Sequence, residues 1–378
     1  MTTPGYLFMA LGFLLSLMLS AWTGTFLCTA LFVYHLVASI FYWHYSLTHS
    51  ADSNGYYQFV PDGENLGVST HFVGVITAFL RDLFGASYLD LFMLFHIFGY
   101  AGLVLLYVLC HRVLQDHPEG RDPVLALKIG AFLPGLHFWT CAIGKDSLIF
   151  MAIVCFIWSL RSPATRSPAL LAGLALAFFI RPHIATALLG ACAVALLSSS
   201  DVPMRWRVPG FGLVLIALWF ALPPLVAFLK LEDVSVGTVA NYIERRQEDN
   251  LDGGTSVDIS SYSFPLQFFT YMFRPLFLDA SGALALVVSV ENLLYLGLCL
   301  YLAPDVARAV WRGHGGFFTR FNFVFWLAAT SILATTTANM GLAIRQKTMV
   351  IPSLLLLLLT AYSRSASPRE VAVPLTAE

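Results

Sequence analysis

Several charged residues in this sequence could do chemistry because they interrupt apolar runs. Lys145 and Asp146 stand side by side in WTCAIGKDSLIF, Arg181 follows the apolar FFI, and Asp52 lies in ADSNGYYQF. In hydrocarbon, a charge is costly unless it is paired or faces a water-filled cavity. Clustered cations bind phosphate oxygens, and a carboxylate beside a hydroxyl can act as a general base. These residue types predict a site for an anion with an acid at its edge.

The cationic candidates share one property, which is that they stand at the ends of apolar runs. Arg gives planar, bidentate recognition of phosphate oxygens, and Lys gives a point charge. Any one of them is equally well explained as an interface anchor or a snorkelling residue. Four run ends that present cations to one leaflet favour a pocket for a lipid phosphate or diphosphate headgroup. The candidates for lipid-phosphate or substrate binding are Lys145, Asp146, Arg181, His183, Arg274, Arg345 and Lys347.

The acidic candidates also have structural alternatives. Asp52 is the candidate catalytic base, but a loop Asp can equally shape a turn with the residues that follow it. Asp146 can equally satisfy free N–H groups at a helix start. Glu291 lies inside an apolar run, where a functional role competes with a hydrogen bond between helices. Further candidates near Asp52 are His49, Tyr56 and Tyr57; no spacing of His, Cys or acids matches a metal motif.

The composition defines the solvent in which these residues act. Of 378 residues, 58% are hydrophobic and 11% are charged, and the mean hydropathy is +0.75. An ordinary soluble domain has roughly 25% charged residues. Apolar runs near the roughly 20 residues that cross a bilayer recur along the chain. We therefore expect an all-α, polytopic helical membrane protein that forms one integral domain over residues 1–378, with no nucleic-acid partner. Six Cys without a CxxC pair predict neither disulfides nor zinc.

The expected membrane spans number about eleven, with a range of about 10 to 13. They cover 5–22, 24–45, 87–110, 122–140, 146–161, 168–181, 183–198, 209–229, 283–302, 321–339 and 348–363. Basic residues that flank alternate connections, among them Arg166, Arg207 and Arg312, are assigned to the cytoplasm by the positive-inside rule. The loops 46–86 and 230–282 then face outward with amphipathic interface helices, and the N-terminus lies outside. The run 168–180 is too short to cross, so Arg181 requires a cavity.

The arrangement of these features resembles the GT-C class of polyprenyl-phosphate-dependent glycosyltransferases. The segments THSADSNGYY, FWTCAIGKDSLIF, FIRPHIA, MFRPLF and ANMGLAIRQKTM also look like membrane proteins of bacterial polysaccharide clusters, including exopolysaccharide polymerases. The resemblance implies that Asp52 activates the acceptor. It implies that Lys145, Arg181, Arg274 and Arg345 contact the lipid phosphate. The chain lacks the paired DxD-like acids of many such enzymes, which leaves the acceptor class and a divalent metal open.

The expected function is transfer of a sugar from a polyprenyl (di)phosphate carrier to a glycan or lipid acceptor. The resemblance places this reaction on the outer face of a bacterial cytoplasmic (inner) membrane, in cell-envelope or exopolysaccharide synthesis, with other envelope-glycan enzymes as partners. No cofactor is implied beyond the polyprenyl-phosphate-linked sugar donor. A repeat-unit polymerase is the alternative. A transporter or flippase of an anionic lipid is a second alternative, although no internal repeat supports it.

Overall fold

The computed structural model describes residues 1–23, 25–63, 66–115, 131–233, 235–251, 254–280, 282–311 and 316–365, and every named element in these ranges is helical. The helices are α1 (Thr3–Thr23), α2 (Leu27–Ser46), α3 (Asp52–Gln58), α4 (Thr70–Phe84), α5 (Tyr88–Gln115), α7 (Pro134–Thr140), α8 (Lys145–Leu160), α9 (Ser167–Ile180), α10 (Pro182–Ser198), α11 (Met204–Leu229), α12 (Val236–Glu248), α13 (Phe264–Phe273), α14 (Ala283–Trp311), α15 (Gly316–Thr336), α16 (Met340–Gln346), the 3-10 turn η1 (Lys347–Met349) and α17 (Ile351–Ser365). Within these ranges there is no strand, and Ser256 and Asn339 form an isolated bridge.

The lengths of the apolar helices confirm a polytopic helical membrane protein. Among the described residues, six helices are long and apolar enough to cross a bilayer: α1, α2, α5, α11, α14 and α15. The bent pairs α7–α8, at 114°, and α16–α17, at 60°, raise the number to as many as eight. The count of eleven stays a prediction, and much of its span 122–140 lies outside the described residues, as does Arg312.

The short helices predicted before and after Arg181 are confirmed. Helix α9 has 14 residues and α10 has 17. At 1.5 Å per residue, α9 is only about 21 Å long, which is less than the ~30 Å of a hydrocarbon core. Pro182 follows Arg181 directly, and a proline disfavours helical backbone at the residue before it. The two helices therefore meet at Arg181, which ends one and caps the other.

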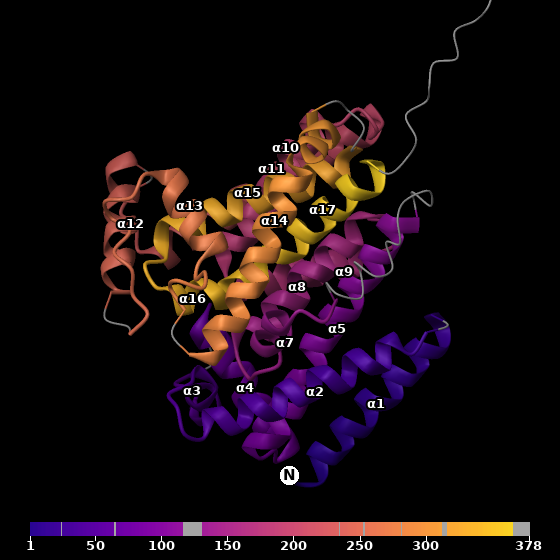
Figure 1. Cartoon of the computed structure of the whole chain (residues 1–378), viewed down its shortest axis with the longest axis vertical. Helices are drawn as coiled ribbons and strands as arrows, with labels where there is room; N and C mark the ends of the chain where they lie inside the picture. Colours follow the sequence, from indigo (N-terminus) through magenta and orange to yellow (C-terminus); the bar gives the residue numbers. More distant parts are fainter. Residues whose placement is uncertain are drawn as a thin grey trace, which may run out of the picture.

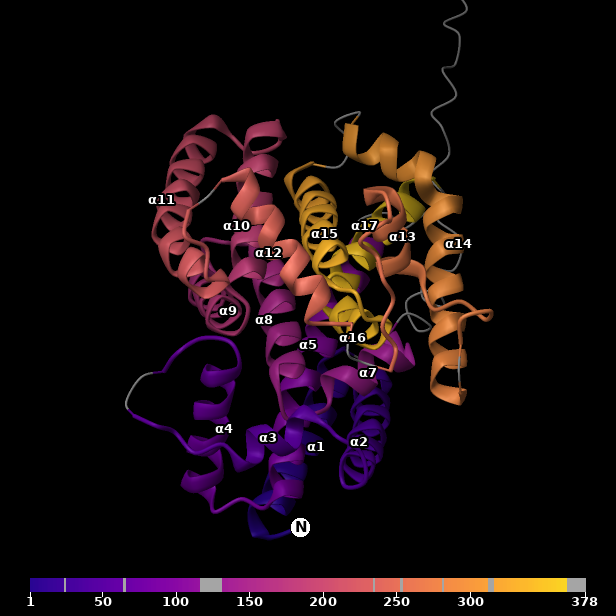
Figure 2. The same ribbon diagram turned by 90° about the vertical axis from the view of Figure 1, so that its left-hand side faces the viewer.

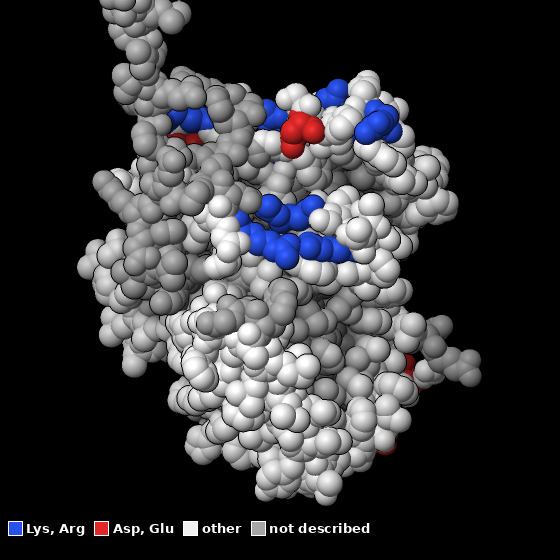
Figure 3. Space-filling view, turned by 90° about the vertical axis from the view of Figure 1, so that its right-hand side faces the viewer, with Lys and Arg blue, Asp and Glu red and all other residues white. Residues whose placement is uncertain are grey.

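The segments with the candidate residues and the basic helix ends lie on opposite sides of the bundle. In Figure 1, α3, α12 and α16 lie along the left-hand side, and Figure 2, which faces that side, shows them near its centre. Figure 3 views the opposite side and shows Lys and Arg side chains gathered in its upper half, with an acidic group among them. Arg112 and Arg161 lie near enough to Arg166 to interact with it electrostatically. Which side faces the cytoplasm stays a prediction.

The outer surface and the core of the bundle differ in the way that a bilayer requires. Helix α11 exposes Leu213, Trp219 and Phe220, of which Trp219 is 76% accessible. A surface of this kind would be an association site in water, whereas lipid tails solvate it in a membrane. The amphipathic helix predicted in the first outer loop is α4, which buries Phe72 and exposes Phe79. Its position in the membrane plane stays a prediction.

Candidate functional site

The candidate site begins at the sharp bend between α7 and α8. The bend ends at Gly144, whose φ of +150° lies in the region that favours glycine. A Cβ atom at this position would lie 3.2 Å from a ring carbon of Tyr56, so the absence of a side chain lets α3 approach the bend. Lys145 and Asp146 open α8 immediately afterwards. The turn thus presents a cation and a carboxylate toward α3.

Arg345 on α16 joins the two predicted acids. Its Nη1 donates to Oδ2 of Asp52 at 2.6 Å, and its Nε donates to Oδ2 of Asp146. Nη2 of Arg181 lies 3.9 Å from the other oxygen of Asp146. Asp146 therefore neutralises cations instead of capping its helix, and Asp52 pairs with an arginine instead of only shaping a turn. The side chains of Arg345 and Asp146 are 17% and 7% accessible, whereas that of Asp52 is 58% accessible.

Lys145 completes the set of charges, which we call the ion cluster: Asp52, Lys145, Asp146, Arg181 and Arg345. Nζ of Lys145 donates to the hydroxyl oxygens of Ser69, at 3.0 Å, and Thr70, at 2.7 Å. It forms no ion pair within the described part of the chain. The three cations exceed the two carboxylates, which leaves a net charge of +1. The predicted convergence of these residues is present, with Asp52 as the most accessible member.

Several buried polar atoms beside Arg181 have no hydrogen-bond partner among the residues that the structure describes. They are Nε of Arg181, Oδ1 of Asp146, Nδ1 of His183 and the hydroxyl oxygen of Tyr271. Tyr271 and His183 both lie close enough to Arg181 to interact with it electrostatically. Buried polar groups in proteins are nearly always hydrogen-bonded. The unused hydrogen-bond donors and acceptors around Arg181 therefore suit a polar ligand or water.

Arg274 and Lys347 lie outside the ion cluster, and their contact with a lipid phosphate stays a prediction. Arg274 donates two hydrogen bonds to Asp279, at 2.9 and 2.8 Å. The hydrogen bond raises the pKa of Arg274 and lowers the pKa of Asp279. Lys347 is buried and donates to the carbonyl oxygen of Arg274 at 3.0 Å and to Oδ1 of Asn292 at 2.8 Å. Local partners within the fold thus occupy both cations.

The remaining candidates have structural contacts. Oε1 of Glu291 accepts the backbone N–H of Gly135 at 2.7 Å, which matches the alternative of a bond between helical segments. His49 stacks on Tyr45, with ring centroids 4.0 Å apart, and Tyr57 packs against Tyr88 at 5.1 Å. Of the residues proposed near Asp52, Tyr56 therefore lies at the bend, whereas His49 and Tyr57 contact other aromatic rings.

Sequence reasoning missed the hydroxyl and phenol groups of the site. Ser69 and Thr70 hold Lys145, and Tyr271 lies beside Arg181. Ser69 has a φ of +61°, and its N–H donates to the carbonyl oxygen of Phe179 at 2.7 Å, which fixes the start of α4 near the end of α9. The polar pair in GVSTH was a usable signal, but Tyr271 looks like any other aromatic residue in FFTYMF.

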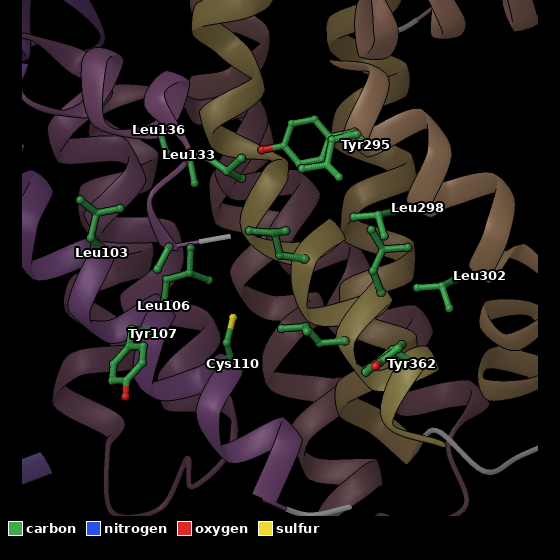
Figure 4. Close-up of a pocket in the computed structure, with 15 residues that line it drawn as sticks. Leu103, Leu106, Tyr107, Cys110, Leu133, Leu136, Tyr295, Leu298, Leu302 and Tyr362 are labelled. Carbon is green, nitrogen blue, oxygen red and sulfur yellow. The ribbon is translucent and has the colours of Figure 1, made fainter. Parts of the chain in front are cut away.

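A separate apolar cavity of about 290 Å³ lies between α5, α14 and α17. Leucines form most of its wall, and Figure 4 shows Leu136 and Tyr295 at one end with Cys110 and Tyr362 at the other. Tyr295 lies one helical turn after Glu291, and Leu136 follows Gly135, so the Glu291–Gly135 hydrogen bond is close to the first end. The lining suits a hydrocarbon chain.

Three buried histidines form a further cluster on α2, α5 and α7. The ring of His35 lies 4.8 Å from that of His96 and 5.2 Å from that of His137. Within the described part of the chain, both nitrogens of His35 and of His96 have no hydrogen-bond partner. Over the described ranges, no group of three or more His, Cys, Asp or Glu side chains is arranged to hold a metal ion. The open question of a divalent metal thus gains no support from these residues.

Comparison with known proteins finds no matching family model, no similar curated protein and no similar solved structure. No match therefore supports the resemblance of the sequence to GT-C enzymes. The ion cluster and the apolar cavity are the features of this chain that point to a function.

Proposed function

We propose that this chain is a membrane glycosyltransferase that moves a sugar from a polyprenyl (di)phosphate carrier to a glycan or lipid acceptor. The observation that carries the proposal is the ion cluster, in which three partly buried cations exceed two carboxylates, one of which is the accessible Asp52. Cations that converge in a partly desolvated site bind phosphate through charge-assisted hydrogen bonds. A simple structural network of ion pairs would have no need of an excess cation or of unpartnered donors near Arg181.

The reaction assigns one role to each part of the cluster. The bond between the sugar carbon and the carrier phosphate breaks, and the acceptor oxygen forms the new bond to that carbon. The acceptor proton passes to Asp52, whose Oδ1 has no hydrogen bond from the described residues, while Oδ2 is held by Arg345. Lys145 and Arg181 stabilise the negative charge that develops on the leaving phosphate. Arg345 acts as a positioning residue, because it fixes both carboxylates.

The apolar cavity supports a lipid carrier over a water-soluble sugar nucleotide. Its leucine walls would take part of an isoprenoid chain, whose burial is favourable in proportion to the apolar area removed from water. The cavity lining includes Leu355 and Leu358 on α17, the helix that follows Arg345 and η1. The cation-rich end and the hydrocarbon-binding region are thus built on consecutive elements.

One observation favours the repeat-unit polymerase as a second candidate. The guanidinium of Arg345 donates a hydrogen bond to Oδ2 of Asp52. This oxygen is therefore not free to accept the proton of the acceptor. A polymerase in which arginines position two diphosphate carriers depends less on such an acid. Removal of the Asp52 carboxylate should therefore lower turnover strongly in the transferase and less in the polymerase.

The test uses purified protein in lipid vesicles with a panel of polyprenyl-phosphate sugars and radiolabelled acceptors. Asp52→Asn should keep donor binding, while turnover falls by roughly 100- to 10,000-fold, because the amide cannot accept the proton. Arg181→Ala should weaken donor binding by about 10- to 150-fold, because it removes a charge-assisted hydrogen bond. Asp249→Asn and Arg246→Ala, which change an accessible ion pair, are matched controls. Wild-type turnover in Asp52→Asn would favour the polymerase, and no transfer from any carrier would refute both.

A further inference from the structure

Three arginines come together on the side of the bundle opposite to the ion cluster. Arg112 lies in the last turn of α5, Arg161 follows the last residue of α8, and Arg166 precedes the first residue of α9. The positive charges of Arg112 and Arg161 both act on Arg166. We call these residues the arginine triad. Figure 3 views the side of the molecule on which such basic side chains gather.

The turn between α8 and α9 positions the triad. The N–H of Arg166 donates to the carbonyl oxygen of Ser162 at 3.0 Å. Nη1 of Arg166 donates to the carbonyl oxygen of Trp158 at 2.8 Å, and its guanidinium carbon lies 3.9 Å from the centroid of that indole ring. The guanidinium carbon of Arg161 lies 5.2 Å from the centroid of the Phe318 ring. An aromatic ring orients a guanidinium in this way but does not remove its charge.

The helix dipoles account for two of the arginines but not for the third. Cations are favourable near the C-terminal end of a helix, where Arg112 and Arg161 lie. Arg166 lies at the N-terminal end of α9, where a positive charge is unfavourable. Partial burial lowers the pKa of Arg166, and the charges of Arg112 and Arg161 lower it further. An anion between the guanidinium groups would offset this repulsion.

Two described acids at the same ends of the helices have other partners. Asp201 accepts the backbone N–H at the start of α15 at 2.9 Å. Asp305 pairs with Arg308 at 2.8 Å. Over the ranges that the structure describes, neither Arg112 nor Arg166 forms an ion pair, and Arg166 uses its side chain on one backbone carbonyl. A guanidinium has five N–H donors, so both side chains keep donors for a ligand.

We infer that the arginine triad binds the phosphate of an anionic membrane lipid. Guanidinium groups recognise phosphate oxygens through paired, charge-assisted hydrogen bonds, and basic pockets between transmembrane helices bind anionic headgroups. Leu171 on α9 is 64% accessible, so an apolar surface for the acyl chains begins within two helical turns of Arg166. This surface favours a lipid over a free phosphate. The site is separate from the ion cluster and does not depend on the proposed function.

The experiment measures the lipids that the full-length protein retains in native mass spectrometry, after release from micelles with equal amounts of phosphatidylglycerol and phosphatidylcholine. Wild type should bind phosphatidylglycerol at least about tenfold more tightly, because its headgroup has a net negative charge. Arg112→Gln/Arg166→Gln should reduce this preference by about tenfold, because it removes two charges of the triad. Arg205→Gln/Arg308→Gln removes two charges from accessible positions at the same helix ends and should keep the wild-type preference.

Soluble competitors separate a lipid from a free anion. Inorganic phosphate and glycerophosphoglycerol, which is the headgroup without its chains, should not displace phosphatidylglycerol when present at the same concentration. Displacement by either one would show that the triad takes a free phosphate and would overturn the lipid.

Three further outcomes would overturn the inference. Equal binding of the two lipids by wild type would show that the headgroup charge is not recognised, and this measurement needs no variant. A wild-type preference in folded Arg112→Gln/Arg166→Gln would show that the triad does not hold the lipid. An equal loss of preference in Arg205→Gln/Arg308→Gln would show that only the total charge of this side matters.

Discussion

The guanidinium of Arg345 bonds two carboxylates at once, Asp52, which lies 293 positions earlier in the chain, and Asp146, which lies 199 positions earlier. One side chain thus holds together α3, the start of α8 and α16. The planar fork of Arg suits this task, because its N–H groups point in fixed directions toward two separate oxygens. The geometry of the candidate site therefore depends on this residue.

Substitution of Arg345 should destabilise the protein. Arg345→Ala leaves buried Asp146 with Arg181 as its partner at 3.9 Å, and removal of one member of a buried pair typically costs about 3–5 kcal/mol. Arg345→Lys should also be destabilising, because one ammonium cannot reproduce both bonds. Thermal unfolding in detergent measures the effect. The double variant Asp146→Asn/Arg345→Gln should recover part of it, and the accessible Arg246→Ala should change stability by at most about 1 kcal/mol. Wild-type stability of Arg345→Ala would contradict the central role of the arginine.

Filling the apolar cavity should affect long carriers and spare short ones. Leu298 lines the cavity, whereas Leu300 on the same helix is 70% accessible and faces outward. Leu298→Trp should weaken binding of geranylgeranyl phosphate by about tenfold or more, because the ring takes space that the chain would fill. Binding of the five-carbon prenyl phosphate should be unchanged. Leu300→Trp is the control, and an equal loss for both probes in Leu298→Trp would show that the cavity does not hold the chain.

The Arg274–Asp279 pair should make a pH-dependent contribution to stability. The hydrogen bond from Arg274 lowers the pKa of Asp279, so the stabilisation is present above the ordinary carboxyl pKa of about 3.9. It is lost as the pH falls through the lowered pKa of the folded state. The difference in Tm between wild type and Asp279→Asn should therefore be constant from about pH 5 to 7 and shrink below about pH 4. Glu232→Gln is an accessible control, and a difference that grows on acidification would reverse the sign of the argument.

The two sides of the bundle should be separable by labelling in intact cells. Single cysteines placed at Asp62 and Ser260, near the candidate site, should react with an impermeant maleimide. Single cysteines at Thr165 and Arg205, at the basic helix ends, should react only after the membrane is permeabilised. The six native cysteines are buried or partly buried, and a cysteine-free background removes their signal. Labelling of position 205 but not 62 would reverse the predicted orientation.

The members of the ion cluster could be predicted from the sequence, but their partners could not. Lys145, Asp146 and Arg181 were recognisable because charge within an apolar run needs an explanation in a bilayer. That Arg345 contacts Asp52 and Asp146 depends on the 114° bend before α8 and on the 60° bend after α16; Gly144 marks the first bend, but its angle cannot be read from the sequence. Bends of this kind are set by the packing of distant helices.

Other candidates have partners that their charge alone does not reveal. Arg274 looked like the remaining cations, yet Asp279, five residues later in RPLFLD, neutralises it. Glu291 looked functional because it is intramembrane, and its bond to the N–H of Gly135 is a helix contact. Tyr271 carried no signal at all, because an aromatic residue in an apolar helix is usually core. The acidic partner of Arg274 can be found in the sequence, because Asp279 lies only five residues later. The backbone partner of Glu291 depends on the fold.

The long reach of the Arg345 contacts has a consequence for biogenesis. Asp52, Asp146 and Arg181 leave the ribosome well before Arg345, since chains are made from the N-terminus at about 5–20 residues per second. During that interval Asp146 lacks its bond to Arg345 and has only Arg181, at 3.9 Å, as a cationic partner. A nascent chain that ends before α16 should accordingly be a substrate for membrane quality control. Synthesis of α16 and α17 would then supply the cation that lets the chain pass this control.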